Sequence, residues 1–336
     1  MLGSETKVND ILKGINQSLL RNINYKFQLY GSEALIKKKI EKYKRLIQVS
    51  EIIDCDSFIS MDDKPADIVR TKENSSMYRA IKAVKDNHSD ALLSFGNTGA
   101  LMSLSTLHIK TLEFIRRPAI ASIWPNMLGE SIVLDLGANT KLDARYLIDN
   151  SILGASLAVI LFKIDSPSVG LLNVGVEDNK GREEIKLASD KLKEFTKNIN
   201  INYQGYVEGN DISFGKTNVV VTDGFTGNIA LKTAEGTAKL FQSHLNDAFR
   251  SSILSKIGFF FASLAMKSVR DRLDPRVHNC GILMGLNSLV VKCHGHSEFR
   301  GVSYAADIIY SLLENNVNNK IQHYVSGIQT KLTKGN

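Results

Sequence analysis

The chain has 336 residues, of which 43% are hydrophobic and 23% are charged, and its formal net charge is +7. This is the composition of an ordinary globular protein that can bury a sizeable core. No block of six like charges occurs, so no nucleic-acid partner is expected, and the modest positive charge favours an anionic substrate or an acidic partner protein.

Strand-like and helix-like segments alternate along the chain, judged by the spacing of their apolar residues. In chain order the predicted elements are a helix (8–23), a strand (26–30), a helix (32–43), a strand (46–55), a helical turn starting at Pro65 (64–71), a helix (75–86), a strand (91–95), a helix (97–109), two strands (118–124 and 131–136), a helix (142–161), a strand (168–175), a helix (182–196), a strand (217–222), a helix (228–245), a strand (287–293) and a helix (303–317). This order predicts an α/β fold in which a mostly parallel sheet carries helices on both faces.

The organisation predicted from this pattern is simple. No internal repeat or flexible linker interrupts it, so residues 1–336 are expected to form a single domain. Residues 240–275 have a helical pattern that does not follow the alternation, and we expect them to form a helical excursion from the sheet.

Three junctions between a strand and a helix share glycine and small polar residues. They read GNTG at residues 96–99, DLGAN at 135–139 and DGFTGN at 223–228. Ligands of an open parallel sheet bind beyond the carboxyl ends of its strands, where helix starts with free N–H groups attract phosphate. A fourth loop, NVGVEDNK at 173–180, adds Glu177 and Lys180. Four such loops in one chain favour an anion-binding site over a set of structural turns.

Motifs of several other protein classes do not occur in the sequence. The chain has no G-x-G-x-x-G, no Walker A run and no G-x-S-x-G, so a dinucleotide, an ATP-type P-loop and a serine hydrolase are poorly supported. His278, Cys280, Cys293, His294 and His296 suggest zinc by residue type. The twelve residues between the two cysteines and the lack of a C-x-x-C pair weaken that interpretation. We therefore expect no metal and no cofactor.

The sequence also favours a location in the cytoplasm. Three cysteines without a close pair indicate a reducing compartment rather than a disulfide framework. The first ten residues, MLGSETKVND, lack the regions of a signal peptide, and no apolar run reaches the roughly 20 residues of a membrane span.

Eight stretches of the chain resemble the bacterial phosphate acyltransferases of phospholipid synthesis, the PlsX type. They are MDDKPADIVRTKENSSMYRAI, GNTGALM, RRPAIA, VLDLGAN, VGLLNVGVEDNKG, GYVEGNDI, VVVTDGFTGNIALKT and LMGLNSLVVKCHG, and they lie in the family's order. The resemblance implies transfer of an acyl group from acyl carrier protein to inorganic phosphate, which gives acyl phosphate. It also implies a fold similar to that of phosphate acetyltransferases and isocitrate-type dehydrogenases.

The loops and the resemblance together suggest individual site residues. We expect Lys180 to offset the charge of phosphate and Asn228 to donate its amide to phosphate or to the thioester oxygen. The other expected substrate- and phosphate-binding residues are Gly96, Asn97, Thr98, Gly99, Asp135, Gly137, Asn139, Asn173, Glu177, Asp223, Thr226, Gly227, Lys292 and His294. Phosphate is a nucleophile at neutral pH and a thiolate leaves readily, so no Ser-His-Asp triad is required. Plainer alternatives are a solvated Lys180, an Asn228 that only caps its helix and an Asp135 that only braces its loop.

Residues 253–273, ILSKIGFFFASLAMKSVRDRL, are apolar in the middle and basic at the flanks. Such a segment is typical of a dimer-interface helix or of a helix that lies on an anionic lipid surface, and both can hold in one dimer. Members of the resembling family associate peripherally with membranes. We therefore expect a cytoplasmic, peripherally membrane-associated homodimer, which contacts acyl carrier protein and a membrane glycerol-phosphate acyltransferase.

The amino end departs from the resembling family, which begins with a strand and a D-A-M-G-G-D-type loop. This chain reads MLGSET from about the Met of that motif, so Leu2 replaces a glycine and Ser4 an aspartate. We expect that the first strand and one loop of the site are missing, and that this form is less stable and slower than an extended one. The alternatives to acyl transfer from acyl carrier protein are a short-chain acyl-CoA phosphate acyltransferase and an inactive descendant that acts as a binding or scaffold protein.

Overall fold

The computed structural model describes residues 6–22, 24–63, 68, 73–196, 199–273, 280–295 and 297–334. Its helices are α1 (Val8–Arg21), α2 (Glu33–Ile40), α3 (Lys44–Gln48), α5 (Ser76–Lys85), α6 (Thr98–His108), α7 (Ala144–Phe162), α8 (Glu183–Phe195), α9 (Gly209–Phe214), α10 (Gly224–Arg250), α11 (Ile253–Leu273), α12 (Phe299–Glu314) and α13 (Val317–Lys334). Its strands are β1 (Phe27–Gly31), β2 (Ser50–Asp54), β3 (Ala91–Ser94), β4 (Ala119–Asn126), β5 (Gly129–Leu134), β6 (Ser168–Leu172), β7 (Asn202–Val207), β8 (Val219–Val221), β9 (Cys280–Met284) and β10 (Leu289–Cys293).

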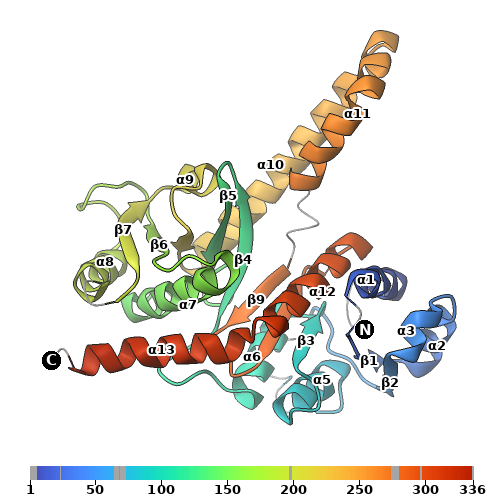
Figure 1. Cartoon of the computed structure of the whole chain (residues 1–336), viewed down its shortest axis with the longest axis horizontal. Helices are drawn as coiled ribbons and strands as arrows, with labels where there is room; N and C mark the ends of the chain where they lie inside the picture. Colours follow the sequence, from blue (N-terminus) through green and yellow to red (C-terminus); the bar gives the residue numbers. More distant parts are fainter. Residues whose placement is uncertain are drawn as a thin grey trace.

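Eight strands form one sheet in the order β3-β10-β9-β4-β5-β8-β6-β7, and β1 and β2 form a separate parallel pair (Figure 1). The neighbours β3 and β10, β5 and β8, β8 and β6, and β6 and β7 are parallel. The central neighbours β10 and β9, β9 and β4, and β4 and β5 are antiparallel. The predicted α/β fold with a mostly parallel sheet is confirmed. The reversal of strand direction between the two parallel blocks was not predicted.

Helices cover both faces of the sheet, as the alternation predicted. One apolar core packs α1, α7, α12 and α13 against the sheet, and the other packs α5 and α6 against its opposite face. By length and composition α7 could cross a bilayer, which corrects the expectation that no apolar run reaches the length of a membrane span. Of its apolar window, 72% is buried inside the protein, which is typical of the core helix of a globular domain.

The registers of the strand pairs place the ends of both parallel blocks on one line. A single row of paired residues crosses the sheet through Leu93, Val291, Ile282, Ala121, Leu134, Val221, Leu171 and Tyr206. The strands β3, β10, β5, β8, β6 and β7 all end within two residues of this row. The block of β3 and β10 runs opposite to the block of β5, β8, β6 and β7. The loops that follow the strands of the two blocks therefore begin at the same row of residues but leave it in opposite directions. We call this row the end line of the sheet.

Several elements differ from the sequence-based predictions. Residues 46–48 belong to α3, so the strand predicted at 46–55 begins only at Ser50. The strands β7 and β9 and the helices α3, α9 and α13 were not predicted. In segments of five or six residues, such as β7, β9 and α9, apolar spacing does not distinguish a helix from a strand. The turn predicted at Pro65 lies outside the described residues.

The helices α10 and α11 form a long hairpin that projects from the body of the molecule (Figure 1). The helix α10 starts directly after β8 and runs for 27 residues, and α11 has 21. The helical excursion predicted at 240–275 is confirmed as far as Leu273, apart from the short connection at 251–252. Its first half continues the helix that begins at the DGFTGN loop, so the hairpin and the candidate site share α10.

Candidate active site

The first turn of α10 is capped by the side chain of Asp223. Its Oδ1 accepts hydrogen bonds from the N–H groups of Phe225 and Thr226, each at 3.0 Å, and its Oδ2 accepts one from the Thr226 hydroxyl at 2.7 Å. The Gly224 N–H donates to the carbonyl of Asn139. These N–H groups, which the sequence suggested were free for phosphate, are already taken by protein acceptors. Asp223 and Thr226 therefore hold the loop in place.

Asp135 is the buried brace of the loop that follows β5, and its side chain is 0% exposed. Its carboxylate accepts from the N–H groups of Ile120, Gly137, Ala138 and Asn139 at 2.7 to 3.1 Å and from the Tyr146 hydroxyl at 2.8 Å. Burial raises the pKa of Asp135, and hydrogen bonds from Ala138 and Asn139 lower it in part. The carboxylate is saturated with protein donors, so the geometry favours the bracing role over ligand contact.

The side chain of Asn139 also points into the protein. Its Nδ2 donates to the Pro118 carbonyl at 2.8 Å and to the Tyr146 hydroxyl at 2.7 Å. Burial raises the pKa of Tyr146, and the charge of Asp135 raises it further, so this hydroxyl stays protonated. These hydrogen bonds fix the DLGAN loop on the side that faces the protein interior.

Three glycines let the DLGAN loop lie directly on the start of α10. A Cβ on Gly227 would lie 1.9 Å from the Asp135 carbonyl oxygen, and one on Gly224 would lie 2.6 Å from Asp135 Oδ2. Gly137 has a φ of +132°, a conformation that side-chain-bearing residues rarely adopt. The nearest atoms to a Cβ on Gly137 belong to the Asn228 side chain, at 3.7 Å. In the structure Gly137 and Gly227 thus serve the close packing of the two loops, and their expected contact with phosphate stays a prediction.

Asn228 lies at the edge of this junction with its amide uncommitted. It is exposed, and its side chain has no hydrogen-bond partner within the part of the chain that the structure describes. Since Asp223 is the N-cap of α10, the alternative that Asn228 merely caps the helix does not hold. Its amide is available as a donor beside the Gly137 backbone.

Of the helices that follow the GNTG and DGFTGN motifs, α6 is the one whose start offers free N–H groups in the described structure. Asn97 caps it, since its Oδ1 accepts from the Ala100 N–H at 3.0 Å, while its Nδ2 donates to three backbone carbonyls within residues 60–63. Asn97 is therefore committed to the scaffold. The N–H groups of Thr98 and Gly99 have no acceptor among the described residues. They form the positive end of the helix dipole. This start can bind an anion.

The loop after β6 carries the predicted cation. Asn173, which is buried, donates from Nδ2 to the Lys180 carbonyl at 3.2 Å, and the Lys180 N–H donates to the Glu177 carbonyl at 3.0 Å. A Cβ on Gly181 would lie 2.0 Å from Asn173 Oδ1. Asn173 thus holds the loop closed, while the side chains of Glu177 and Lys180 are exposed. In the described structure the Lys180 ammonium forms no ion pair.

The end of β10 meets α10 across the end line of the sheet. Lys292 is buried and donates to the Cys293 carbonyl. Next to it, His294 Nε2 lies 2.9 Å from Lys232 Nζ, which also pairs with Glu235 Oε2 at 2.9 Å. An ammonium can only donate in this contact, so His294 accepts through Nε2 in its neutral form. The contact joins the residue after β10 to helix α10, which follows β8 in the block of opposite direction.

Lys232 is a candidate functional residue that the sequence analysis missed. It follows Asn228 by four residues, so both lie on one face of α10. This i, i+4 spacing from Asn228 in a predicted helix was the signal that could have identified it.

The cysteines of the HNC and CHGH motifs face each other in the sheet. Cys280 and Cys293 are direct partners on β9 and β10, and both are buried as free thiols. Burial raises the pKa of Cys280 to about 12 and that of Cys293 well above its usual range, so neither is a thiolate. His278 and His296 lie outside the described residues. Among those that are described, no group of three His, Cys, Asp or Glu side chains could hold a metal.

Comparison with known proteins identifies the family. The model of a family described as "Fatty acid synthesis protein" matches residues 1–320. The chain is 43% identical to a phosphate acyltransferase of Xanthobacter autotrophicus over 98% of its own length and 92% of that protein's. It is 44% identical to a phosphate acyltransferase of Mesorhizobium japonicum, over 90% and 85% of the two chains. The chain belongs to the phosphate acyltransferase family. This confirms the resemblance seen in the loops.

Solved structures show the same fold for this phosphate acyltransferase. A phosphotransacetylase from Streptococcus pyogenes matches with a TM-score of 0.59 and 15% identity, over 96% of this chain and 92% of that one. A branched-chain phosphotransacylase from Enterococcus faecalis matches with a TM-score of 0.51 and 13% identity, over 89% and 99%. At such identities the likeness concerns the fold alone, and it confirms the fold that the resemblance implied. Family and fold together make the protein an acyltransferase.

Proposed function

We propose that this phosphate acyltransferase transfers a fatty acyl group reversibly from acyl carrier protein to inorganic phosphate, forming acyl phosphate for phospholipid synthesis. The observation that carries the proposal is a set of uncommitted polar groups on the loops and helix starts that follow the strands at the end line of the sheet. They are the N–H groups of Thr98 and Gly99, the amide of Asn228 and the ammonium of Lys180. Donors without protein acceptors suit a multiply charged oxyanion substrate.

In the proposed reaction, a phosphate oxygen attacks the carbonyl carbon of the thioester. A C–O bond forms, the C–S bond breaks, and the carrier leaves as a thiolate, whose conjugate thiol has an unperturbed pKa of about 8.5. Negative charge grows on the carbonyl oxygen during attack, and preorganised donors stabilise it. We assign the Asn228 amide as a donor to this oxygen or to phosphate, and the N–H groups at the start of α6 as donors to phosphate. Lys180 and Lys232 would compensate the negative charge.

Substrate class separates this proposal from its alternatives. The test is phosphate-dependent thiol release from acyl carrier protein and from CoA, each loaded with acyl groups of several lengths. Preference for long acyl groups on the carrier supports the proposal, whereas preference for short acyl-CoA supports the short-chain alternative. Absence of release from every thioester, in a folded protein, supports the inactive binding or scaffold protein.

Lys180→Ala is expected to lower acyl-phosphate formation at least about 100-fold, because the exposed, unpaired cation proposed to compensate the charge of phosphate is lost. Stability should change little, since the side chain makes no ion pair in the described structure. The measurement is the rate of phosphate-dependent thiol release. Lys191→Ala removes an exposed lysine from α8 and is the charge-matched control. Turnover near that of the control would place Lys180 among ordinary solvated lysines.

The α10–α11 hairpin supports a second part of the proposal, which is peripheral contact with an anionic membrane in the cytoplasm. Large exposed apolar residues gather on it: Leu240, Phe241, Ile253, Leu254, Ile257, Phe259, Phe260 and Phe261. Arg250 and Lys256 lie among them, the arrangement of an interfacial helix pair. The same apolar surface suits a homodimer, and membrane contact would bring acyl phosphate close to a membrane glycerol-phosphate acyltransferase.

Phe260→Asp combined with Phe261→Asp is expected to release the protein from anionic vesicles. These rings are 75% and 80% exposed, so the folded chain should tolerate the change. Phe259, also expected to contact the membrane, packs against Phe249 at 4.8 Å between ring centroids and is left intact. The measurement is co-sedimentation with phosphatidylglycerol vesicles. Leu128→Asp alters an equally exposed apolar residue on the β4–β5 hairpin and should still co-sediment. Equal sedimentation of all forms would exclude α11 as the contact.

A further inference from the structure

The uncommitted donors of the candidate site belong to two separate blocks of the sheet. The N–H groups of Thr98 and Gly99 are at the start of α6, which follows β3 in the block of β3 and β10. Asn228 lies on α10, which follows β8 in the block of β5, β8, β6 and β7, and Lys180 lies in the loop after β6 of the same block. A substrate that binds donors from both sets contacts both blocks, so the contacts between the blocks determine the geometry of the site.

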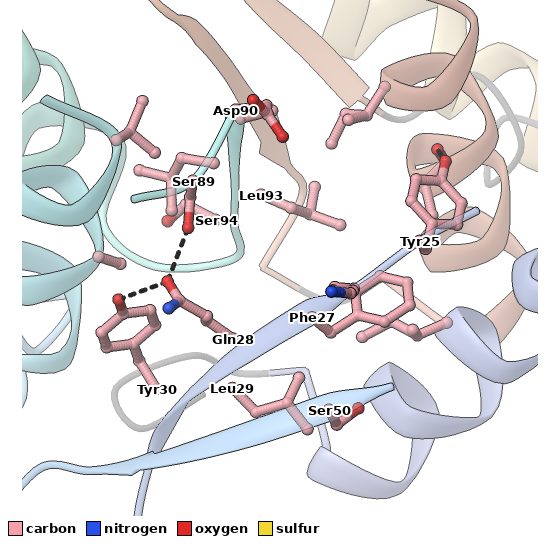
Figure 2. Close-up of a pocket in the computed structure, with 18 of the residues that line it drawn as sticks. Tyr25, Phe27, Gln28, Leu29, Tyr30, Ser50, Ser89, Asp90, Leu93 and Ser94 are labelled. Atoms are coloured by element: carbon pink, nitrogen blue, oxygen red, sulfur yellow. Dashed lines mark hydrogen bonds between the residues drawn. The ribbon is translucent and has the colours of Figure 1, made fainter. Parts of the chain in front are cut away.

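The block of β3 and β10 is open on one side. Figure 2 shows its edge strand β3 facing β1 across a cavity of about 1090 Å³. Ser94 and Gly96, where the chain leaves β3 toward α6, line this cavity. The support for this connection therefore comes from the other side of β3, where Lys292 of β10 pairs with Ser94. His294 lies two residues beyond that pair, so it leaves the sheet beside the GNTG loop.

The side chains of His294 and Lys232 connect the two blocks. His294 Nε2 lies 2.9 Å from Lys232 Nζ, and Lys232 Nζ also donates to Glu235 Oε2 at 2.9 Å. Lys232 follows Asn228 by four residues and shares its face of α10. The contact therefore joins a residue beside the GNTG loop to the helix face that carries the uncommitted amide.

Two acceptors orient the ammonium of Lys232. An ammonium has three N–H donors, of which His294 and Glu235 accept one each. The third has no acceptor among the described residues. A lysine side chain without such partners samples many rotamers, because its four-carbon stem is flexible. The two acceptors thus hold a positive charge and one free donor at a fixed place beside Asn228.

We infer that His294 is a positioning residue, which acts on the reaction through Lys232 rather than through its own contact with phosphate. It holds the ammonium where the charge and the third N–H serve the phosphate, a role that rests on the proposed function. Only a neutral imidazole can fill this role. A protonated His294 would carry an N–H on Nε2 in place of an acceptor, and it would place a second cation 2.9 Å from the ammonium.

The positioning of Lys232 should therefore depend on pH. Imidazoles gain a proton between about pH 5 and pH 8, so the contact is expected to be lost as the pH falls through this range. The charged groups around His294 act on the same equilibrium. Besides Lys232 and Glu235 of α10, the elements that meet at His294 carry Lys7 and Asp10 at the start of α1, Lys292 on β10, and Glu298 and Arg300 at the start of α12.

The first test compares His294→Gln with the unmodified protein. Glutamine keeps an acceptor for the Lys232 ammonium but takes up no proton. Phosphate itself titrates in this range, so the measured quantity is the ratio of the two rates of phosphate-dependent thiol release at each pH. We expect this ratio, variant over unmodified, to rise at least about threefold from pH 8 to pH 5. His323→Gln, at an exposed position on α13, is the control and should give a constant ratio. A constant ratio for His294→Gln would overturn the positioning role.

A double substitution separates positioning from direct contact. His294→Leu should lower kcat/KM for phosphate at least about 10-fold, because a displaced ammonium compensates the charge less well. Lys232→Met should lower it at least as much, and the double variant no further than Lys232→Met alone. If the two losses multiply, His294 contacts the substrate itself and the positioning role fails.

Nuclear magnetic resonance of the His294 ring gives a readout that needs no catalysis. In Lys232→Met the ring should take up its proton at a higher pH, because a neighbouring cation disfavours the imidazolium. Lys239→Met, at an exposed position on α10, is the control and should leave the titration unchanged. If the titration depends on Lys232 but no thioester releases thiol, the contact stands and the proposed function fails. If thiol is released while the titration does not depend on Lys232, the positioning role fails.

Discussion

Replacing Asn228 by alanine is expected to lower the rate of acyl-phosphate formation at least about 100-fold. The amide stands beside the Gly137 backbone with no acceptor or donor partner among the described residues. Loss of one preorganised donor typically costs a factor of about 10² to 10³ in rate. The measurement is phosphate-dependent thiol release from acyl carrier protein at saturating phosphate.

The same variant should unfold at nearly the same temperature as the unmodified protein. Asn228 is exposed and unbonded, so truncation removes no interaction of the scaffold. Thr233→Ala, at an exposed position five residues further along α10, is the matched control and should leave the rate unchanged. A slow Asn228→Ala enzyme with normal Tm supports a direct role in the reaction. Turnover close to that of Thr233→Ala would remove Asn228 from the mechanism.

Asp135→Ala is expected to destabilise the protein by about 4 kcal/mol or more. Five donors lose their acceptor, two of them in buried and three in part-buried hydrogen bonds, and each unsatisfied buried group costs about 1 to 3 kcal/mol. Losses of this size are exceptional for single substitutions and indicate a broken network. The measurement is urea unfolding followed by circular dichroism. Tyr146→Phe removes one donor of the same network and should cost only about 1 kcal/mol.

The contrast between the two positions tests the division of roles. If Asp135 is a brace, its loss should lower stability and rate together, because the DLGAN loop and the first turn of α10 lose their common support. A stable Asp135→Ala protein with a large loss of rate would contradict the bracing role. That result would instead support direct contact between Asp135 and the substrate.

Local sequence was sufficient for much of the fold. Apolar periodicity identified the buried helices such as α7, and the Asp, Ser and Asn residues ahead of α10, α5 and α6 act as caps in the structure. The GNTG, DLGAN and DGFTGN motifs lie, as expected, directly after strands. These features depend on neighbours within a few residues, so a single sequence determines them.

Pairing over long sequence distances was decided only by the tertiary structure. The sequence could not show that β9 and β4 reverse the sheet direction, because strand direction depends on partners more than 100 residues away. It therefore could not show that both parallel blocks end on one line. The contact of Lys232 with His294, which are separated by 62 residues, depends on that geometry.

The difference between local sequence and long-range contacts also explains which site residues could be assigned a role from sequence. Sequence identified Asp135, Asn97 and Asp223 as polar residues at strand ends, and such residues suit either a ligand or a loop brace. Only the packed structure shows that their oxygens are filled by nearby N–H groups, whereas the donors of Thr98, Gly99 and Asn228 are not. The reason is physical. Whether a polar group is free depends on every neighbour that the fold brings within hydrogen-bond reach, and residue type alone does not contain that information.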